Sequence, residues 1–96
     1  MSIYISQARW TQQGAQNLKE SPARLDDVKK SFQAHGVKVL HFFLTTGAHD
    51  ILLISEAPNY EAMAKATLAL ISKGSVTTQT SRAFTEDEYR KLIGSL

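Results

Sequence analysis

The chain has 96 residues, 43% of them hydrophobic and 21% charged, and 11 Lys and Arg against 9 Asp and Glu give a net charge of +2. These values fit a single globular domain over residues 1–96, with a modest core and no deep enclosed cavity. No run approaches the ~20 apolar residues that cross a bilayer and no signal-peptide segment is present, so we expect a cytoplasmic protein without membrane contact. The lack of cysteine excludes disulfides, thiolate nucleophiles and cysteine-ligated metals.

The first third of the chain predicts a strand followed by a helix. Residues 3–10 are rich in β-formers and contain no breaker. Ser21 and Pro22 are typical of a helix start, with serine as N-cap and proline at the first helical position. Gly36 ends this helix, whose apolar positions follow at helical spacing: Leu25, Val28 and Phe32. Residues 14–20 are expected to form a helical turn or a structured loop before it.

Two apolar runs in the middle of the chain predict a β-hairpin. Residues 37–46 and 50–56 are both rich in β-formers and too evenly apolar for a surface helix. Gly47-Ala48 lies between them, and glycine at the first central position suits a two-residue type II′ turn.

The last third predicts a helix, a strand and a short terminal helix. Pro58-Asn59 opens the helix and Gly74 ends it. A Thr-rich strand follows over residues 76–84, and Thr85-Glu86-Asp87-Glu88 matches a capping box. The order β-α-β-β-α-β therefore predicts an α+β, ferredoxin-like fold, with one antiparallel sheet in the order 4-1-3-2 and helices on one face.

The hairpin register assigns its residues to two faces of the sheet. A turn at residues 47–48 places one apolar set under the helices: Leu40 opposite Ser55, Phe42 opposite Leu53, and Leu44 opposite Ile51. The other face is also apolar but has no helix to cover it. We expect a second copy to pack on it around a two-fold axis, with an interface of Val39, Phe43, Leu52 and Ile54. A register error of one residue would exchange the two faces.

Five groups of residues occur in a specific order and spacing over nearly the whole chain. They are Trp10-Thr11-Gln12-Gln13-Gly14, Ser21-Pro22-Ala23-Arg24, Gly47-Ala48-His49-Asp50, Glu56-Ala57-Pro58, and Gly74-Ser75-Val76 with Thr80-Ser81-Arg82-Ala83-Phe84. With this spacing the chain resembles the GYD-domain family of small bacterial proteins in the dimeric α/β-barrel superfamily. The resemblance implies a ferredoxin-like dimer. It implies no specific chemistry, because the superfamily includes monooxygenases, lactone isomerases, haem-handling enzymes and binding modules.

The chain departs from the family pattern at the hairpin, where His49 stands in place of a tyrosine. Asp50 is its neighbour at a strand start, so the two side chains should point to opposite faces and form no dyad. We expect Asp50 to accept hydrogen bonds from turn amides and His49 to fill the tyrosine position, with a ligand-facing His49 as the alternative. His41 and Glu56 are expected to be diagonal neighbours on the open face. Either the Glu56 carboxylate orients the His41 imidazole, or the two form an ordinary polar pair at the rim of the dimer interface.

Other polar residues are candidates for a ligand site. Trp10 and Thr11 end the first strand, where they would line the mouth of a pocket. Arg24 and Arg82 would grip a carboxylate bidentately if both reached one cleft, and would otherwise be solvated surface groups. The three histidines lie on different elements without metal-ligand spacing, so no metal is expected, and no motif predicts a cofactor. One basic doublet, Lys29-Lys30, is offset by nearby acids, so nucleic acid is not an expected partner.

The leading hypothesis is a homodimer that binds a small organic ligand in a cleft between sheet and helices. Its candidate contacts are Trp10, Thr11, Arg24, His41, His49, Asp50, Glu56 and Arg82. One alternative is a cofactor-independent enzyme, of the isomerase or monooxygenase type, that uses a histidine base in the same cleft. Another is a structural or assembly module.

Overall fold

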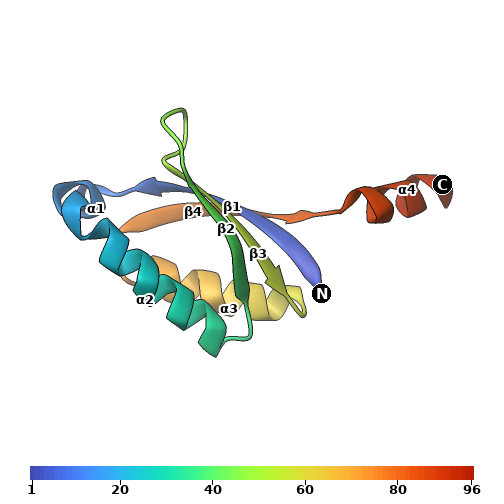
Figure 1. Ribbon diagram of the computed structural model, residues 1–96, viewed down its shortest axis with the longest axis horizontal. Coiled ribbons are helices and arrows are strands. Elements are labelled where there is room, and N and C mark those ends of the chain that lie inside the picture. Colours follow the sequence, from blue (N-terminus) through green and yellow to red (C-terminus); the bar gives the residue numbers. More distant parts are fainter.

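The computed structural model describes all residues from 1 to 96. Its elements in chain order are β1 (Ser2–Trp10), α1 (Gln12–Gln16), a 3₁₀ turn (Leu18–Glu20), α2 (Ser21–Ala34), β2 (Lys38–Leu44), β3 (Ile51–Ala57), α3 (Tyr60–Ile71), β4 (Val76–Ala83) and α4 (Glu86–Gly94). The strands form one antiparallel sheet in the order β2-β3-β1-β4, which is the predicted ferredoxin-like order read from the other edge. Helices α2 and α3 cover one face, and α4 projects beyond the end of β4 (Figure 1). No helix combines the length and the apolar character that a membrane span requires.

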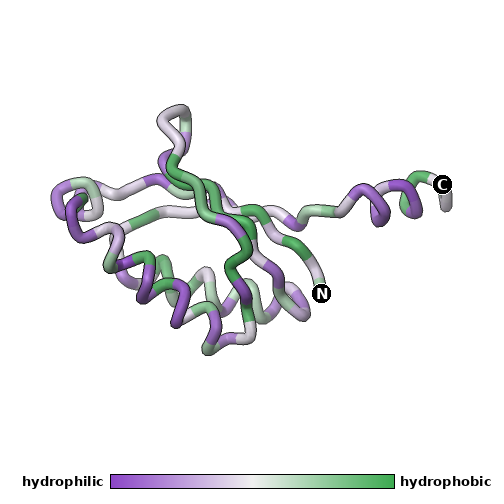
Figure 2. The backbone as a smooth tube through the Cα atoms, viewed as in Figure 1, coloured by the Kyte–Doolittle hydropathy of each residue, from purple (hydrophilic) through white to green (hydrophobic).

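The core lies between the sheet and the two covering helices. Alternate residues of β1 point toward the helices and are buried, as the two-residue period of a strand requires: Tyr4, Ser6 and Ala8. From α2 and α3 come Phe32, Met63 and Ala66, which are at most 1% exposed. Hydrophobic residues are concentrated in the central strands, whereas polar and apolar residues alternate along α2 (Figure 2). The sheet face under the helices therefore forms the protein's one buried layer.

The hairpin pairing confirms most of the predicted register. Phe42 lies opposite Leu53, and both contribute to the core under the helices. Two further predicted pairs are present, Leu44 with Ile51 and His41 with Ile54. The pairing is therefore as predicted from residue 41 to residue 44, but Leu44 is 63% exposed and does not lie under the helices as expected.

A β-bulge between Val39 and His41 changes the register at the start of β2. Val39, and not Leu40, lies opposite Ser55. Because paired residues share a face, Val39 turns toward the helices and packs against the core cluster. The prediction that Val39 belongs to the open face is therefore wrong.

The loop of the hairpin is longer than the predicted two-residue turn. The Thr45 N–H donates to the Asp50 carbonyl over 2.8 Å, which leaves residues 46–49 as the loop. Gly47 lacks the positive φ that the first central residue of a type II′ turn needs. The Thr45 hydroxyl donates to the His49 carbonyl, so a side chain closes the loop in place of a tight turn.

The helix ends agree with most of the capping signals. The 3₁₀ turn runs directly into α2, so Glu20 and not the predicted Ser21 is its N-cap. The Asn59 side chain caps α3 by accepting from the Ala62 N–H over 2.9 Å. The capping box at the start of α4 is also present. The two glycines that end α2 and α3 both have positive φ: Gly36 (76°) and Gly74 (82°).

Helix α1 lies against the turn that follows α3. The Thr11 hydroxyl accepts from the Gly14 N–H and donates to the Gly74 carbonyl over 2.6 Å. A Cβ atom on Gly14 would overlap the Ser75 carbonyl oxygen, so only glycine permits this approach.

Helix α4 is held to the end of β4 by an ion pair. Arg82 Nη2 lies 2.9 Å from Glu88 Oε2, and Glu88 Oε1 accepts from the Thr85 N–H over 3.0 Å. The hydrogen bond from Arg82, followed by the one from Thr85, lowers the pKa of Glu88 from 4.5 to about 2. The Arg82 guanidinium also lies 4.4 Å from the centre of the Phe84 ring. These side-chain contacts therefore link α4 to the end of β4.

The apolar side of α4 is exposed in this chain. Tyr89, Leu92 and Ile93 follow the i, i+3, i+4 spacing of one helix face, and Leu96, just beyond the helix end, continues the pattern. Each of the four is about half exposed or more. The chain exposes 6404 Å², whereas a monomeric protein of its mass would expose about 5,500 Å². Its radius of gyration of 14.3 Å likewise exceeds the about 12.5 Å typical of this length.

Replacing Gly14 with alanine is expected to lower the free energy of unfolding by about 1–3 kcal/mol, because the new methyl group meets a backbone carbonyl. Urea denaturation followed by circular dichroism measures the change. The control is Gly47→Ala, where a Cβ atom has no neighbour within 4 Å, and it should be neutral or slightly stabilising. A Gly14→Ala variant as stable as the wild type would contradict the close contact.

Carbon-detected NMR titration is expected to find the Glu88 carboxyl titrating near pH 2. Since the folded state lowers this pKa, the stabilisation by the ion pair is complete above pH 4.5 and is lost as the pH falls toward 2. In Arg82→Met the pKa should return toward 4.5. Arg90→Met, which removes the exposed pair with Glu86, should leave the Glu88 titration unchanged. An ordinary Glu88 pKa in the wild type would show that α4 is not anchored in this way.

Candidate functional site

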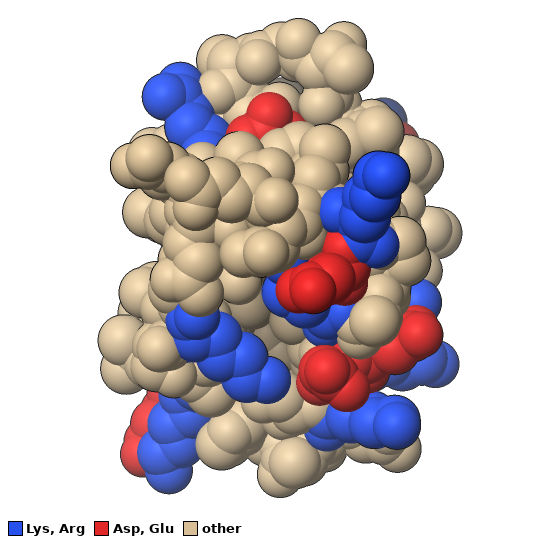
Figure 3. Space-filling view, turned by 90° about the vertical axis from the view of Figure 1, so that its left-hand side faces the viewer, with Lys and Arg blue, Asp and Glu red and all other residues tan.

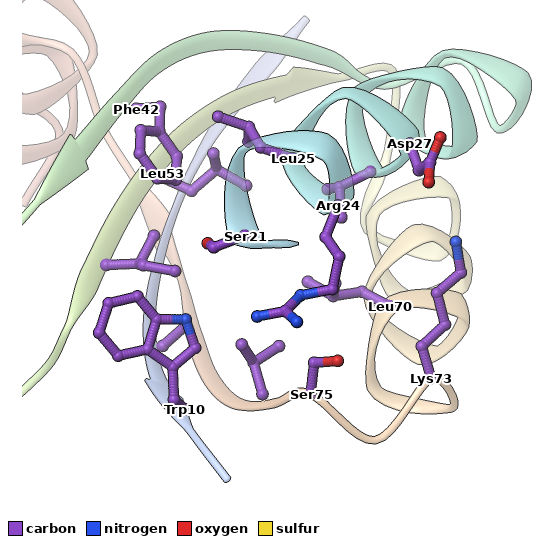
Figure 4. A pocket seen from close by; sticks show the side chains of 14 residues that line it. Trp10, Ser21, Arg24, Leu25, Asp27, Phe42, Leu53, Leu70, Lys73 and Ser75 are labelled. Atoms are coloured by element: carbon purple, nitrogen blue, oxygen red, sulfur yellow. The ribbon is translucent and has the colours of Figure 1, made fainter. Parts of the chain in front are cut away.

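A cavity of about 100 Å³ lies between α2, α3 and the end of the sheet at which β1 stops and β4 begins (Figure 4). Its wall is mostly apolar and includes residues of both the sheet and the helices. Among the apolar lining residues are Leu25, Val28, Phe42, Leu53, Leu70 and Val76. The helices thus leave a gap in the core at this end of the sheet.

Charged side chains gather among the polar residues that line this cavity. Arg24 and Lys73 bring two cations, and Asp27 brings one carboxylate. The Arg24 guanidinium donates from Nη1 to the Asn17 carbonyl over 2.8 Å and from Nη2 to the Gly14 carbonyl over 3.3 Å. Figure 4 shows this guanidinium directed into the cavity, between the α2 backbone and Ser75. The cavity therefore has an apolar wall with the Arg24 guanidinium directed into it, and Asp27 and Lys73 are exposed at its rim.

Trp10 and Arg24 are the two predicted ligand contacts that the fold brings to this cavity. Trp10 ends β1 opposite Val76 and forms a side wall. The neighbouring Thr11 does not line the cavity, because its hydroxyl caps α1 and bonds to Gly74. Its contribution is to hold α1 in place.

Asp50 accepts a backbone hydrogen bond, as predicted, but from a different strand. Its Oδ2 atom accepts from the Trp10 N–H over 3.0 Å, and its own N–H donates to the Ala8 carbonyl over 2.8 Å. The expected partners were amides of its own turn. Asp50 therefore fixes the end of β1 and, through it, the backbone that carries Trp10.

The histidines lie away from the cavity. His49 lines a separate open hollow together with Gln7, Arg9, Thr77, Thr78 and Gln79. His41 is exposed on the open face of β2, and its ring stacks on Phe43 with 6.2 Å between the ring centres. Glu56 lies opposite Lys38, and no hydrogen bond joins it to His41. The cleft hypothesis, which placed these groups together with Trp10, is not supported by this geometry.

Arg82 lies at the far end of β4 from the cavity. Arg82 pairs with Tyr4 of β1. It lies six residues after Val76, and six residues of strand span about 20 Å. Its guanidinium is bound to Glu88. Arg24 and Arg82 therefore do not converge on one ligand, and the condition for a shared bidentate grip is not met in this fold.

The open face of the sheet is apolar and has no helix over it (Figure 1). Phe43 is 50% exposed there, with half-buried Leu52 and Ile54 beside it. Ile3 and Ile5 of β1 continue the same face, since Ile5 pairs with Ile54.

On the end of the molecule seen in Figure 3, basic and acidic side chains are intermixed.

Sequence reasoning missed Lys73 as a second cation at the cavity. It lies between the end of α3 and Gly74. In the sequence this position indicated only that a helix ends there. Leu25 and Val28 were recognised as core positions of α2, and the gap beside them depends on how α2 and α3 are spaced on the sheet. No sequence signal for that spacing was available.

Four of the motif segments lie at the cavity end of the fold, whereas residues 56–58 and 80–84 lie toward the other end of the sheet. Residues 10–14, 21–24, 47–50 and 74–76 are linked by four contacts. Thr11 bonds to Gly74, Gly14 touches Ser75, Arg24 bonds to Gly14, and Asp50 bonds to Trp10. These motifs therefore build one structural unit around the cavity.

Comparison with known proteins supports the resemblance read from these motifs. Residues 4–93 match the model of the GYD domain. A protein of Thermus thermophilus, named "Glutamine synthetase and cystathionine beta-lyase binding protein", is 32% identical over 84 residues, which are 86% of this chain and 88% of the relative. The chain belongs to the GYD domain family.

Proposed function

We propose that this protein is a self-associating binding protein that docks on a metabolic enzyme, and that glutamine synthetase is the first partner to test. The observation that carries the proposal is the set of large apolar side chains on the open face of the sheet and on α4 that nothing in this chain covers. The total exposed area of the chain, polar and apolar together, is 6404 Å², about 900 Å² more than a monomer of its mass should expose. That excess is close to the roughly 800 Å² that each partner contributes to a stable protein interface.

The open face of the sheet provides the first part of this surface. Its central residues are Phe43, Leu52 and Ile54, with Ile3 and Ile5 beside them. Such a face is self-complementary around a two-fold axis, since each copy presents the same apolar strip to the other. We therefore assign it to a second copy of this chain.

Helix α4 provides the second part. It lies beyond its own sheet, linked to β4 by the Arg82–Glu88 ion pair, and its apolar side chains Tyr89 and Leu92 are about half exposed. It continues from β4, an edge strand of the sheet whose open face is assigned to the second copy. A copy packed on that face is the nearest surface that α4 can cover.

A glutamate at the interface is expected to convert the dimer to monomers, because burying an unpaired carboxylate is unfavourable. The variants are Phe43→Glu and Ile54→Glu on the open face and Leu92→Glu on α4. Native mass spectrometry and sedimentation velocity measure the assembly directly.

The matched control is Leu68→Glu on α3, which is 65% exposed on a helix outside the proposed interface. This variant should remain dimeric. If both open-face variants also remained dimeric, the assignment of that face would be wrong. If Leu92→Glu alone remained dimeric, α4 would lie outside the interface.

The enzyme partner is suggested by the relative from Thermus thermophilus, whose name states that it binds glutamine synthetase and cystathionine beta-lyase. We expect immobilised glutamine synthetase from the same organism as this protein to bind it saturably, with a Kd below about 10 µM. Cystathionine β-lyase is measured in parallel, and serum albumin serves as the control. No saturable binding to either enzyme at about 100 µM would contradict the proposal.

A second candidate function is small-molecule binding. The observation that favours it is the cavity between α2 and α3, which Trp10 and Arg24 line. The enzyme alternative has less support, because neither His41 nor His49 lines this cavity as a base.

A further inference from the structure

We propose that the cavity between α2 and α3 binds a small monocarboxylate, with the apolar tail inside the cavity and the carboxylate on Arg24. The inference rests on small-molecule binding as the second candidate function and adds the chemical class of the ligand. Protein–protein binding, the first candidate, does not depend on it.

The apolar wall and the volume of the cavity define the tail. Leu25, Val28, Phe42 and Leu70 offer no hydrogen-bond partner to a polar group, so a polar tail would lose its hydration without compensation. A cavity of ~150 Å³ lined by apolar side chains takes up benzene. By proportion, this cavity of about 100 Å³ holds an acyl tail of about four carbon atoms.

The polar lining defines the head group as an anion. Arg24 and Lys73 outnumber the single carboxylate of Asp27. Arg24 lies in the first turn of α2, where the helix dipole also favours negative charge. Asp27 and Lys73 are exposed at the rim, whereas the Arg24 guanidinium is directed into the cavity, so a carboxylate bound there would pair with Arg24.

Arg24 is held in position before any ligand arrives. Two of its N–H groups bond to the carbonyls of Asn17 and Gly14, and a guanidinium carries five N–H donors. The remaining donors are free for a carboxylate. Because the side chain is already ordered, binding costs little conformational entropy.

The arrangement also orients the ligand. A carboxylate directed at the apolar wall would be buried without a partner, which is strongly unfavourable. The tail therefore lies between Leu25 and Leu70, and the carboxylate faces the guanidinium beside Trp10 (Figure 4). Inorganic phosphate has no tail and leaves the apolar part of the cavity unfilled.

The test compares 3-methylbutanoate with its neutral isostere 3-methylbutanamide, at constant ionic strength and about 10 mM ligand. Thermal unfolding and isothermal titration calorimetry of the full chain measure binding. The carboxylate should raise the Tm saturably and bind at least tenfold more tightly than the amide. This preference should be lost in Arg24→Met and kept in Arg90→Met, a matched removal of an arginine on α4.

Two further variants keep the result interpretable if Arg24→Met is unstable. Lys73→Met removes the second cation without touching the bonds to Asn17 and Gly14, and it should weaken the carboxylate several-fold and leave the amide unchanged. Val28→Phe fills the cavity and should abolish binding of both molecules.

Each other outcome overturns a defined part of the proposal. Equal binding of carboxylate and amide would refute the carboxylate class while keeping small-molecule binding. Carboxylate binding that survives Val28→Phe would place the ligand elsewhere on the protein. No binding of either molecule to the wild type would refute both the ligand class and the cavity as a binding site.

Discussion

The structure depends on one constraint: a four-stranded sheet has two apolar faces, and the chain supplies helices for one of them. The alternation along β1 sends Tyr4 and Ala8 into the core and leaves Ile3 and Ile5 on the other face. Helices α2 and α3 fill the covered side. The remaining helix, α4, lies beyond the end of β4 and covers neither face, and the Arg82–Glu88 ion pair links it to that strand. The exposed apolar surface, and with it the proposed self-association, follows from this shortage of covering elements.

The opposite end of the molecule is organised by backbone contacts between distant segments. Gly14 allows α1 to touch the carbonyl of Ser75, and Asp50 accepts from the Trp10 amide. Arg24 then bonds to the carbonyl of Gly14 and so joins α2 to α1. Since these contacts fix both sides of the cavity, its shape is maintained without a ligand. The two ends thus support different proposals, protein association at the open face and at α4, and ligand binding at the cavity.

Most of the fold was predictable because its signals are local. Strand alternation, the capping box at Thr85 and the helix-ending glycines act within a few residues. The pairing of Phe42 with Leu53 followed from placing the turn at residues 47–48, and the four-residue loop 46–49 is centred on the same two residues. The bulge between Val39 and His41 was not predictable, because the extra residue changes the register without altering the apolar composition of β2. The hairpin loop was also misjudged, since a side-chain bond from Thr45 closes it and Gly47 does not.

The sequence by itself determined the element order, the ferredoxin-like sheet, the uncovered apolar face and the family. It also identified Trp10 and Arg24 as residues of interest. Only the tertiary structure decided that these two share a cavity with Lys73, and that Arg82, His41 and His49 lie elsewhere. The physical reason is distance across the fold: residues on different elements meet or separate according to helix spacing and strand register. Those quantities are set by packing of the whole chain, and no short segment encodes them.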